Sequence, residues 1–148
     1  MPASGLPPNM YDTILVPIDG SDNANRAARH AMEQAEEFGA TLHSLFVVDT
    51  RLYGEPGLSS TELVIDDIED EGQALLSELA DSAENRGIEA VTRCCHGVPH
   101  EEIIGYADEV DADMVVLGYQ GQTHSIDGHI GSVAERVVRH AGRPVFVV

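Results

Sequence analysis

The chain has 148 residues, 43% of them apolar, which is typical of one globular domain with a buried core. It carries 26 acidic residues against eight basic ones, for a formal net charge of −18, and this excludes a nucleic-acid partner because such a partner requires a basic surface. No apolar run approaches the length of a membrane span, and residues 1–10 lack the features of a signal peptide. We expect a flexible leader at residues 1–10, a single domain at residues 11–148, and a cytoplasmic protein.

All eight basic residues are arginine, and the sequence contains no lysine. Excess carboxylate without lysine indicates a cytoplasm of very high salt, where screening over about 3 Å at 1 M makes self-repulsion tolerable. We therefore predict a halophilic source.

The adjacent Cys94 and Cys95 match no redox or metal motif. In a strand they would point to opposite faces, and we expect both to be reduced packing residues.

Apolar runs and helical periodicities alternate along the chain. In chain order they predict a strand at 11–19, a helix from Ser21 or Asp22 to Gly39, a strand at 41–49, a loop at 50–60, a helix at about 61–85, a strand at 88–95, a helix at 98–110, a strand at 113–118, a helix at 132–142 and a strand at 144–148. Strict alternation favours parallel strands joined by right-handed crossovers. The predicted fold class is α/β: a doubly wound, five-stranded parallel sheet of order 3-2-1-4-5, Rossmann-like, with helices on both faces.

Two helices show a clear buried stripe. In the first helix it consists of Ala24, Ala27, Ala28, Ala31, Ala35 and Phe38. In the second helix it consists of Leu63, Ile65, Ile68, Ala74, Leu75, Leu79 and Ala83. The acidic run "DDIEDE" in the second helix is interpreted as a solvated face.

A ligand of such a sheet binds beyond the carboxyl ends of the strands, where the strand order reverses. For the order 3-2-1-4-5 this point lies between the first and fourth strands. The residues that leave the first strand are Pro17, Ile18, Asp19 and Gly20, and Leu117 and Gly118 leave the fourth. A ligand site is therefore expected between these two groups of residues.

The segment 118–132, "GYQGQTHSIDGHIGS", begins at this point. Its spacing is glycine, two residues, glycine, nine residues, glycine-serine. Gly118 would let the chain turn off the strand, and Gly121 would let main-chain N–H groups approach an anion. Gly131 and Ser132 open a helix whose free N–H groups and dipole suit a phosphate. The spacing predicts a phosphate cradle, and a glycine-rich loop without a ligand is the alternative. Neither a Walker A motif nor the G-x-G-x-x-G dinucleotide motif is present.

From Tyr11 to Val148 the sequence resembles the universal stress protein family. The resemblance rests on "ILVPIDGS", on "VVD" after the second strand, on "GVPHEEII", on the glycine spacing and on the ending "VAERVVRHAGRPVFVV". It implies the fold predicted above and an ATP-binding stress-response protein that acts as a nucleotide-dependent switch. It also implies a homodimer through Arg143–Val148. This segment is expected to form an apolar edge strand of the sheet, and an unpaired edge strand of this kind tends to aggregate.

The resemblance also implies a role for each matching residue. Asp19 and Val47 would contact the adenine, Pro17 and Gly118 the ribose, and Leu117 the pocket wall. The phosphates would be held by Gly121, Gly131, Ser132 and Val133. Asp19 could help to hold Mg²⁺, which the ATP phosphates would mostly bind. As alternatives, Val47 and Leu117 could be core residues, and Asp19 could cap the following helix.

The chain departs from the family in its phosphate loop. Family loops often carry a basic residue before the second glycine, where Gln120 stands, and "QTHSIDGHI" has neither lysine nor arginine. Arg136, one turn into the following helix, is a weak candidate to reach the phosphates. His96, His100, His124 and His129 show no spacing that demonstrates a metal site. No residue is placed to activate water. We therefore expect that the protein is not an enzyme, that it has no catalytic residue, and that any ATP hydrolysis is slow.

Two further hypotheses remain open. One is a dimeric stress-protein scaffold that binds no nucleotide, which the lack of basic loop residues favours. The other is a flavodoxin-like electron carrier or a phospho-receiver domain on a similar sheet. A receiver needs an aspartate at the end of the third strand, where Cys95 and His96 stand, and a flavodoxin needs a Ser/Thr-rich loop after the first strand.

Overall fold

A computed structural model describes residues 11–52, 59–120 and 129–148, without the side chains of residues 52 and 59–63. The predicted leader at residues 1–10 lies outside the described residues. The elements in chain order are β1 Thr13–Pro17, α1 Asp22–Phe38, β2 Thr41–Asp49, a short 3₁₀ helix Thr50–Leu52, α2 Ser59–Asn85, β3 Ala90–Gly97, α3 Pro99–Glu109, β4 Met114–Leu117, α4 Ser132–His140 and β5 Val145–Val147. No helix within the described ranges is long and apolar enough to cross a membrane.

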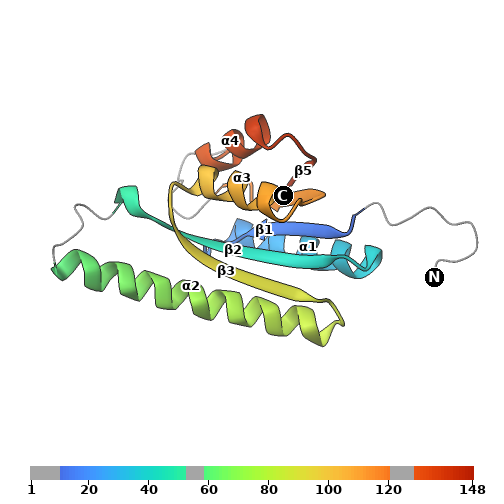
Figure 1. Cartoon of the computed structure of the whole chain (residues 1–148), viewed down its shortest axis with the longest axis horizontal. Helices are drawn as coiled ribbons and strands as arrows, with labels where there is room; N and C mark the ends of the chain where they lie inside the picture. The colour runs from blue at the N-terminus through green and yellow to red at the C-terminus, as the bar shows by residue number, and fades with distance from the viewer. Residues whose placement is uncertain (1–10, 53–58, 121–128) are drawn as a thin grey trace, which may run out of the picture.

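The five strands form one sheet of order β3-β2-β1-β4-β5, and every neighbouring pair is parallel. This confirms the predicted fold class and strand order. Figure 1 shows α2 along one side of the sheet, beside β3 and β2, with α3 and α4 on the other side. The order reverses between β1 and β4, so a crevice is expected beyond the ends of these two strands.

The core has two halves, one on each face of the sheet. Alternate residues of β1 point to opposite faces. Ile14 and Val16 pack toward α1 and α2, whereas Leu15 packs toward α3 and α4, and all three are fully buried. Cys94 and Cys95 likewise pack against opposite halves, as predicted, and both are free thiols.

Helix α1 begins and ends as the sequence predicts. The Oγ of Ser21 accepts a hydrogen bond from the N–H of Ala24 at 3.1 Å, which is the usual N-cap contact. Gly39 closes the helix at φ 67°, a left-handed conformation that favours glycine, and its N–H donates to the carbonyl of Ala35. The predicted alanine stripe is buried, with Met32 added to it.

Two expectations need correction. In α2, Ala74 is exposed, and Leu76 is buried in its place. Gly72, Leu76, Leu79 and Ala83 repeat at intervals of four, three and four residues and share one face, from which Ala74 is turned away. Strand β3 covers 90–97 and not 88–95, because it pairs with β2 residue by residue from Leu42–Ala90 to Asp49–Gly97.

Candidate functional site

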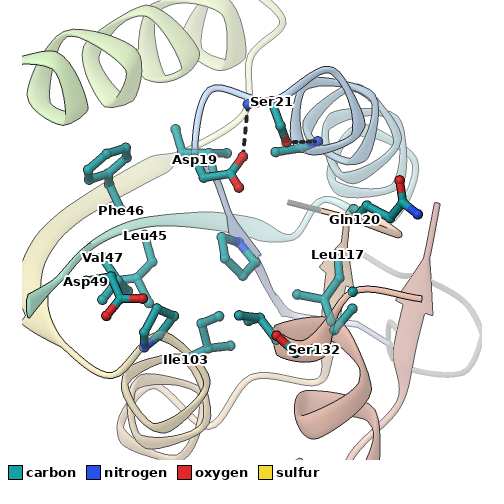
Figure 2. A pocket seen from close by; sticks show the side chains of 18 of the residues that line it. Asp19, Ser21, Leu45, Phe46, Val47, Asp49, Ile103, Leu117, Gln120 and Ser132 are labelled. Atoms are coloured by element: carbon teal, nitrogen blue, oxygen red, sulfur yellow. Dashed lines mark hydrogen bonds between the residues drawn. The ribbon is translucent and has the colours of Figure 1, made fainter. Parts of the chain in front are cut away.

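A cavity of about 280 Å³ opens where β1, β2 and β4 end. Figure 2 shows side chains from these strands and from α3 and α4 around it. Eight of the nine binding residues predicted from the sequence line the cavity: Pro17, Asp19, Val47, Leu117, Gly118, Gly131, Ser132 and Val133. The ninth, Gly121, lies outside the described residues. The switch-point argument therefore places the cavity correctly, while the individual roles of these residues stay predictions.

Local hydrogen bonds fix the chain as it leaves β1. The N–H of Ile18 donates to the carbonyl of Leu45 at 2.8 Å, which continues the pairing with β2 past the end of the strand. One carboxylate oxygen of Asp19 accepts from the N–H of Ser21 at 2.9 Å. Figure 2 shows Asp19 beside Ser21 at the rim. Ser21 thus supplies the side-chain cap of α1, and Asp19 holds the backbone N–H of that cap residue.

Gly118 has a packing requirement of its own. A Cβ added there would lie 2.8 Å from the carbonyl carbon of Asn23 and 2.9 Å from the nitrogen of Ala24. These are backbone atoms in the first turn of α1, and they cannot move aside as a flexible side chain can. Gly118 is not among the glycines with positive φ. Its glycine is therefore required by the close approach of β4 to α1, and not by the sharp turn that the sequence suggested.

The first turn of α4 forms the opposite wall of the cavity. Gly131 is the N-cap, with φ −66° and ψ 153° and no side-chain cap, and its N–H donates to the carbonyl of Tyr119 at 2.8 Å. Ser132, Val133 and Ala134 follow it and line the cavity. The first N–H groups of a helix have no acceptor within the helix, and its dipole favours negative charge there. This wall has the features of an anion site.

Gln120 stands where the family resemblance led us to expect a basic residue, and here its side chain is bonded to the protein backbone. Its Nε2 donates to the backbone carbonyl of His129 at 2.7 Å. The bond joins the two residues that border segment 121–128, which lies outside the described residues. Gln120 thus has a structural role while it also lines the cavity.

Ile18 and Gln120, which the sequence placed next to the expected site, also line the cavity. The structure adds lining residues that the sequence did not indicate: Ser21, Ala24, Leu45, Phe46, Asp49, Ile68, Glu71, Pro99, Ile103 and Ala134. Ile68 and Glu71 come from α2, and Phe46 is 6% exposed and packs in the same half of the core as α2. Ile103 and Leu117 are buried apolar side chains on the other half. Figure 2 shows Leu45, Phe46 and Val47 of β2 on one side of the cavity, called here its apolar end, and Ser132 of α4 on the other side.

The charged groups at the cavity are acidic. Asp19, Asp49 and Glu71 line it, and no lysine or arginine does so among the described residues. Arg51 neutralises Asp49: its Nε and one terminal nitrogen donate to the two carboxylate oxygens, each at 2.9 Å. The hydrogen bonds from Arg51 lower the pKa of Asp49 below its ordinary value, against the effect of burial. Arg136 is exposed and is absent from the cavity lining.

A metal site built on the histidines has no support from the part of the chain that is described. No group of three histidine, cysteine or acidic side chains is arranged to hold a metal ion within it. The Nε2 of His96 lies 3.2 Å from the carboxylate of Glu69, as an exposed pair between β3 and α2. His124 lies outside the described residues.

The fold and the cavity together define a Rossmann-like α/β protein with a pocket at its topological switch point. The chain belongs to the universal stress protein family, whose model matches residues 10–148. It is 40% identical over 141 residues to universal stress protein MJ0531 of Methanocaldococcus jannaschii, covering 95% of this chain and 83% of the relative. These matches set aside the flavodoxin and receiver hypotheses.

Solved structures of universal stress proteins have the same fold as this chain. The universal stress protein UspA of Lactobacillus plantarum superposes with a TM-score of 0.87 at 29% identity, over 93% of this chain and 97% of that one. A universal stress protein solved in complex with cAMP has a TM-score of 0.73 at 27% identity, over 94% of this chain and 97% of its own.

Proposed function

We propose that the cavity binds an adenine nucleotide, with ATP and Mg²⁺ as the working ligands, and that the protein acts as a nucleotide-dependent regulator of the stress response. The observation that carries the proposal is the meeting of β1, β2, β4 and the α4 N-terminus around one cavity. Its apolar end suits a base, and its helix N-terminus suits a phosphate. A relative of the same fold binds cAMP, which is itself an adenine nucleotide.

Within this proposal each group has a distinct task. Val47 and Leu117 offer apolar surface to the base and sugar, and Pro17 lies between them at the end of β1. The N–H groups after Gly131 would hold phosphate oxygens, and Mg²⁺ would supply positive charge between the phosphates and the acidic side chains of the lining, with Asp19 as the candidate ligand. We infer hydrolysis far below the roughly 1 s⁻¹ that marks the slow end of ordinary enzymes.

The direct test is calorimetric titration with ATP and Mg²⁺ in about 1 M KCl, at a protein concentration near 100 μM. We expect saturable heat, and we expect Gly131→Val to abolish it. Because Gly131 has φ −66°, a valine there strains no backbone torsion, and lost binding with an intact fold would report a blocked cavity. Circular dichroism of the variant checks this point. The absence of heat with the wild-type protein would exclude the proposal.

The second candidate function is a dimeric scaffold that binds no nucleotide, and one observation favours it. Neither lysine nor arginine lines the described cavity, and Gln120 is bonded to His129. Mass spectrometry of small molecules released on denaturation separates the two candidates. Recovery of an adenine nucleotide favours the first, and its absence together with no calorimetric heat favours the scaffold.

We propose a homodimer through Arg143–Val148 in either case. Strand β5 pairs only with β4 among the described strands, so its other edge is open, and Phe146 is 40% exposed there. Arg143 is held within its own subunit by the carbonyl of Ala112 and the carboxylate of Asp108. Sedimentation of Phe146→Asp should give a monomer where the wild type gives a dimer, and a wild-type monomer would refute the proposal.

We also propose that the protein comes from a halophilic organism and that it is located in the cytoplasm. A charge of −18 on 148 residues repels itself strongly unless salt screens it. The midpoint of thermal unfolding should rise as KCl increases from about 0.1 to 2 M. A midpoint that is independent of salt would contradict a halophilic adaptation.

A further inference from the structure

One face of β2 forms a wall of the cavity that ends in a carboxylate. Alternate residues of a strand point to the same side, so Leu45, Val47 and Asp49 share this face, and all three line the cavity. Leu45 and Val47 pack in the core half that contains α3 and α4. Asp49 is the last residue of β2, and its side chain is only 15% exposed. Figure 2 shows Asp49 beside Val47, across the cavity from Leu117.

Arg51 holds the carboxylate of Asp49 in one orientation. The backbone N–H and the Nε of Arg51 donate to Oδ1, at 3.1 and 2.9 Å, and one terminal nitrogen donates to Oδ2 at 2.9 Å. Each carboxylate oxygen can accept about two hydrogen bonds. Among the described residues, these contacts fill both positions on Oδ1 and one position on Oδ2. Oδ2 therefore keeps one acceptor position for a further donor.

The local backbone explains only one of the two carboxylate oxygens. Oδ1 accepts from the N–H two residues further along, in a turn that begins the 3₁₀ helix Thr50–Leu52 and that an uncharged asparagine could make equally well. Oδ2 takes no part in this turn. The hydrogen bonds from Arg51 hold the pKa of Asp49 below its ordinary value, so the side chain is ionised at neutral pH and can only accept. A fixed acceptor in a cavity wall suits a ligand that donates to it.

We propose that Asp49 determines base specificity in this cavity: its carboxylate accepts a hydrogen bond from the exocyclic amino group of an adenine that lies on Val47. The inference rests on the proposed function and deepens it, because it assigns a partner to the polar edge of the base. A purine without the amino group would displace water from Asp49 and offer no donor in return. Arg51 is a positioning residue, since it bonds to Asp49 and is absent from the described cavity lining.

Three neutral nucleosides separate the amino group from the rest of the ligand. Adenosine, purine riboside, which lacks only the amino group, and 2′-deoxyadenosine, which lacks one hydroxyl group, are titrated calorimetrically in about 1 M KCl. We expect purine riboside to bind about tenfold more weakly than adenosine, which is the low end for a hydrogen bond to a charged group, because water still reaches Asp49. Equal affinities of these two ligands would overturn the inference. A loss confined to 2′-deoxyadenosine would place the donor on the sugar and overturn it as well.

Asp49→Asn tests whether this side chain causes the discrimination. Asparagine keeps the shape but replaces an acceptor oxygen with a donor, so the affinity for adenosine should fall about tenfold and become similar to that for purine riboside. Asp113→Asn is the matched control. The carboxylate of Asp113 accepts from the N–H groups of Asp12 and Thr13 at the opposite end of the strands, so this variant should lose stability and keep the discrimination. Wild-type discrimination in Asp49→Asn would overturn the inference.

Arg51→Met tests the positioning role, and it keeps Asp49 itself if Asp49→Asn does not fold. The preference for adenosine should fall to about threefold, because the carboxylate is no longer held in place, while the affinity for purine riboside stays unchanged. An undiminished preference in this variant would count against the inference. Circular dichroism establishes that each variant is folded.

Asp19 is the other carboxylate that the family resemblance assigns to the adenine. If Asp19→Asn abolishes the preference for adenosine and Asp49→Asn retains it, the amino group is recognised by Asp19 and the inference fails. If adenosine and ATP bind but purine riboside matches adenosine, the inference fails while the proposed function stands. If neither adenosine nor ATP binds, the proposed function fails, and the inference fails with it.

Discussion

Gly72 in α2 determines where the ring of Phe46 can lie at the apolar end of the cavity. A Cβ at position 72 would lie 2.4, 2.6 and 2.7 Å from three ring atoms of Phe46. Ordinary contact begins near 3.4 Å, so the ring must retreat by about 1 Å (3.4 minus 2.4) in Gly72→Ala. Overpacking of this kind costs about 1–3 kcal/mol, offset by up to about 1 kcal/mol because alanine favours the helix. We expect a net loss of up to about 2 kcal/mol.

The displaced ring of Phe46 would have to enter the cavity or force the helix outward, and either change disturbs the apolar end. We therefore expect Gly72→Ala to weaken adenosine binding several-fold, as measured by calorimetry, with urea unfolding giving the stability. Gly105→Ala is the matched control: Gly105 is also inside a helix, and a Cβ there meets nothing within 4 Å. It should gain about 0.4–1 kcal/mol and bind normally. Equal stability of the two variants would refute the role of Gly72.

Three further predictions concern stability and reactivity. Gly118→Ala should lower the unfolding free energy by about 1–3 kcal/mol in urea titration, because its Cβ would meet the backbone of Asn23; a stability equal to that of Gly105→Ala would contradict this. Burial lowers the pKa of His43, against the smaller effect of Glu89, so the unfolded chain binds more protons near pH 6 and stability falls as the pH drops below about 6.5. His43→Gln should flatten that part of the curve of unfolding free energy against pH, and an unchanged slope would count against the assignment. Burial also raises the pKa of Cys95 to about 11, so iodoacetamide at pH 8 should label the folded protein far more slowly than the unfolded protein, as mass spectrometry would show.

The sequence could predict the sheet order and the place of the cavity, because both follow from features that are local in the chain. Alternating strands and helices determine the parallel sheet, and Pro17 and Gly118 stand directly where two of its strands end. The spacing of the glycine segment also predicted Gly131 and Ser132 as site residues, and both line the same cavity. Ser21 and Gly39 were recognisable as helix ends because a serine hydroxyl can accept from a free N–H of the first turn, and glycine readily adopts the left-handed conformation that closes a helix.

The α2 wall of the cavity could not be predicted in this way. Glu71 and Ile68 reach the site only because α2 crosses β2 and β3 at a particular angle and height, and helical periodicity contains neither quantity. The same limit explains the error over Ala74 and Leu76, since several aliphatic positions of α2 fit one stripe about equally well. The pairing of Asp49 with Arg51 depends on the 3₁₀ helix after β2, which the sequence suggested to be an open loop.

The contact between Gly118 and the first turn of α1 affects how the glycine segment should be interpreted in related chains. A descendant that had lost its ligand would still be obliged to keep this first glycine, because the backbone of α1 leaves no room for a Cβ. Gly131 has torsion angles that any residue can adopt, so its backbone conformation alone does not require glycine. The first glycine of the segment would therefore persist in a lineage that no longer uses the cavity, and its presence is no sign of a bound ligand.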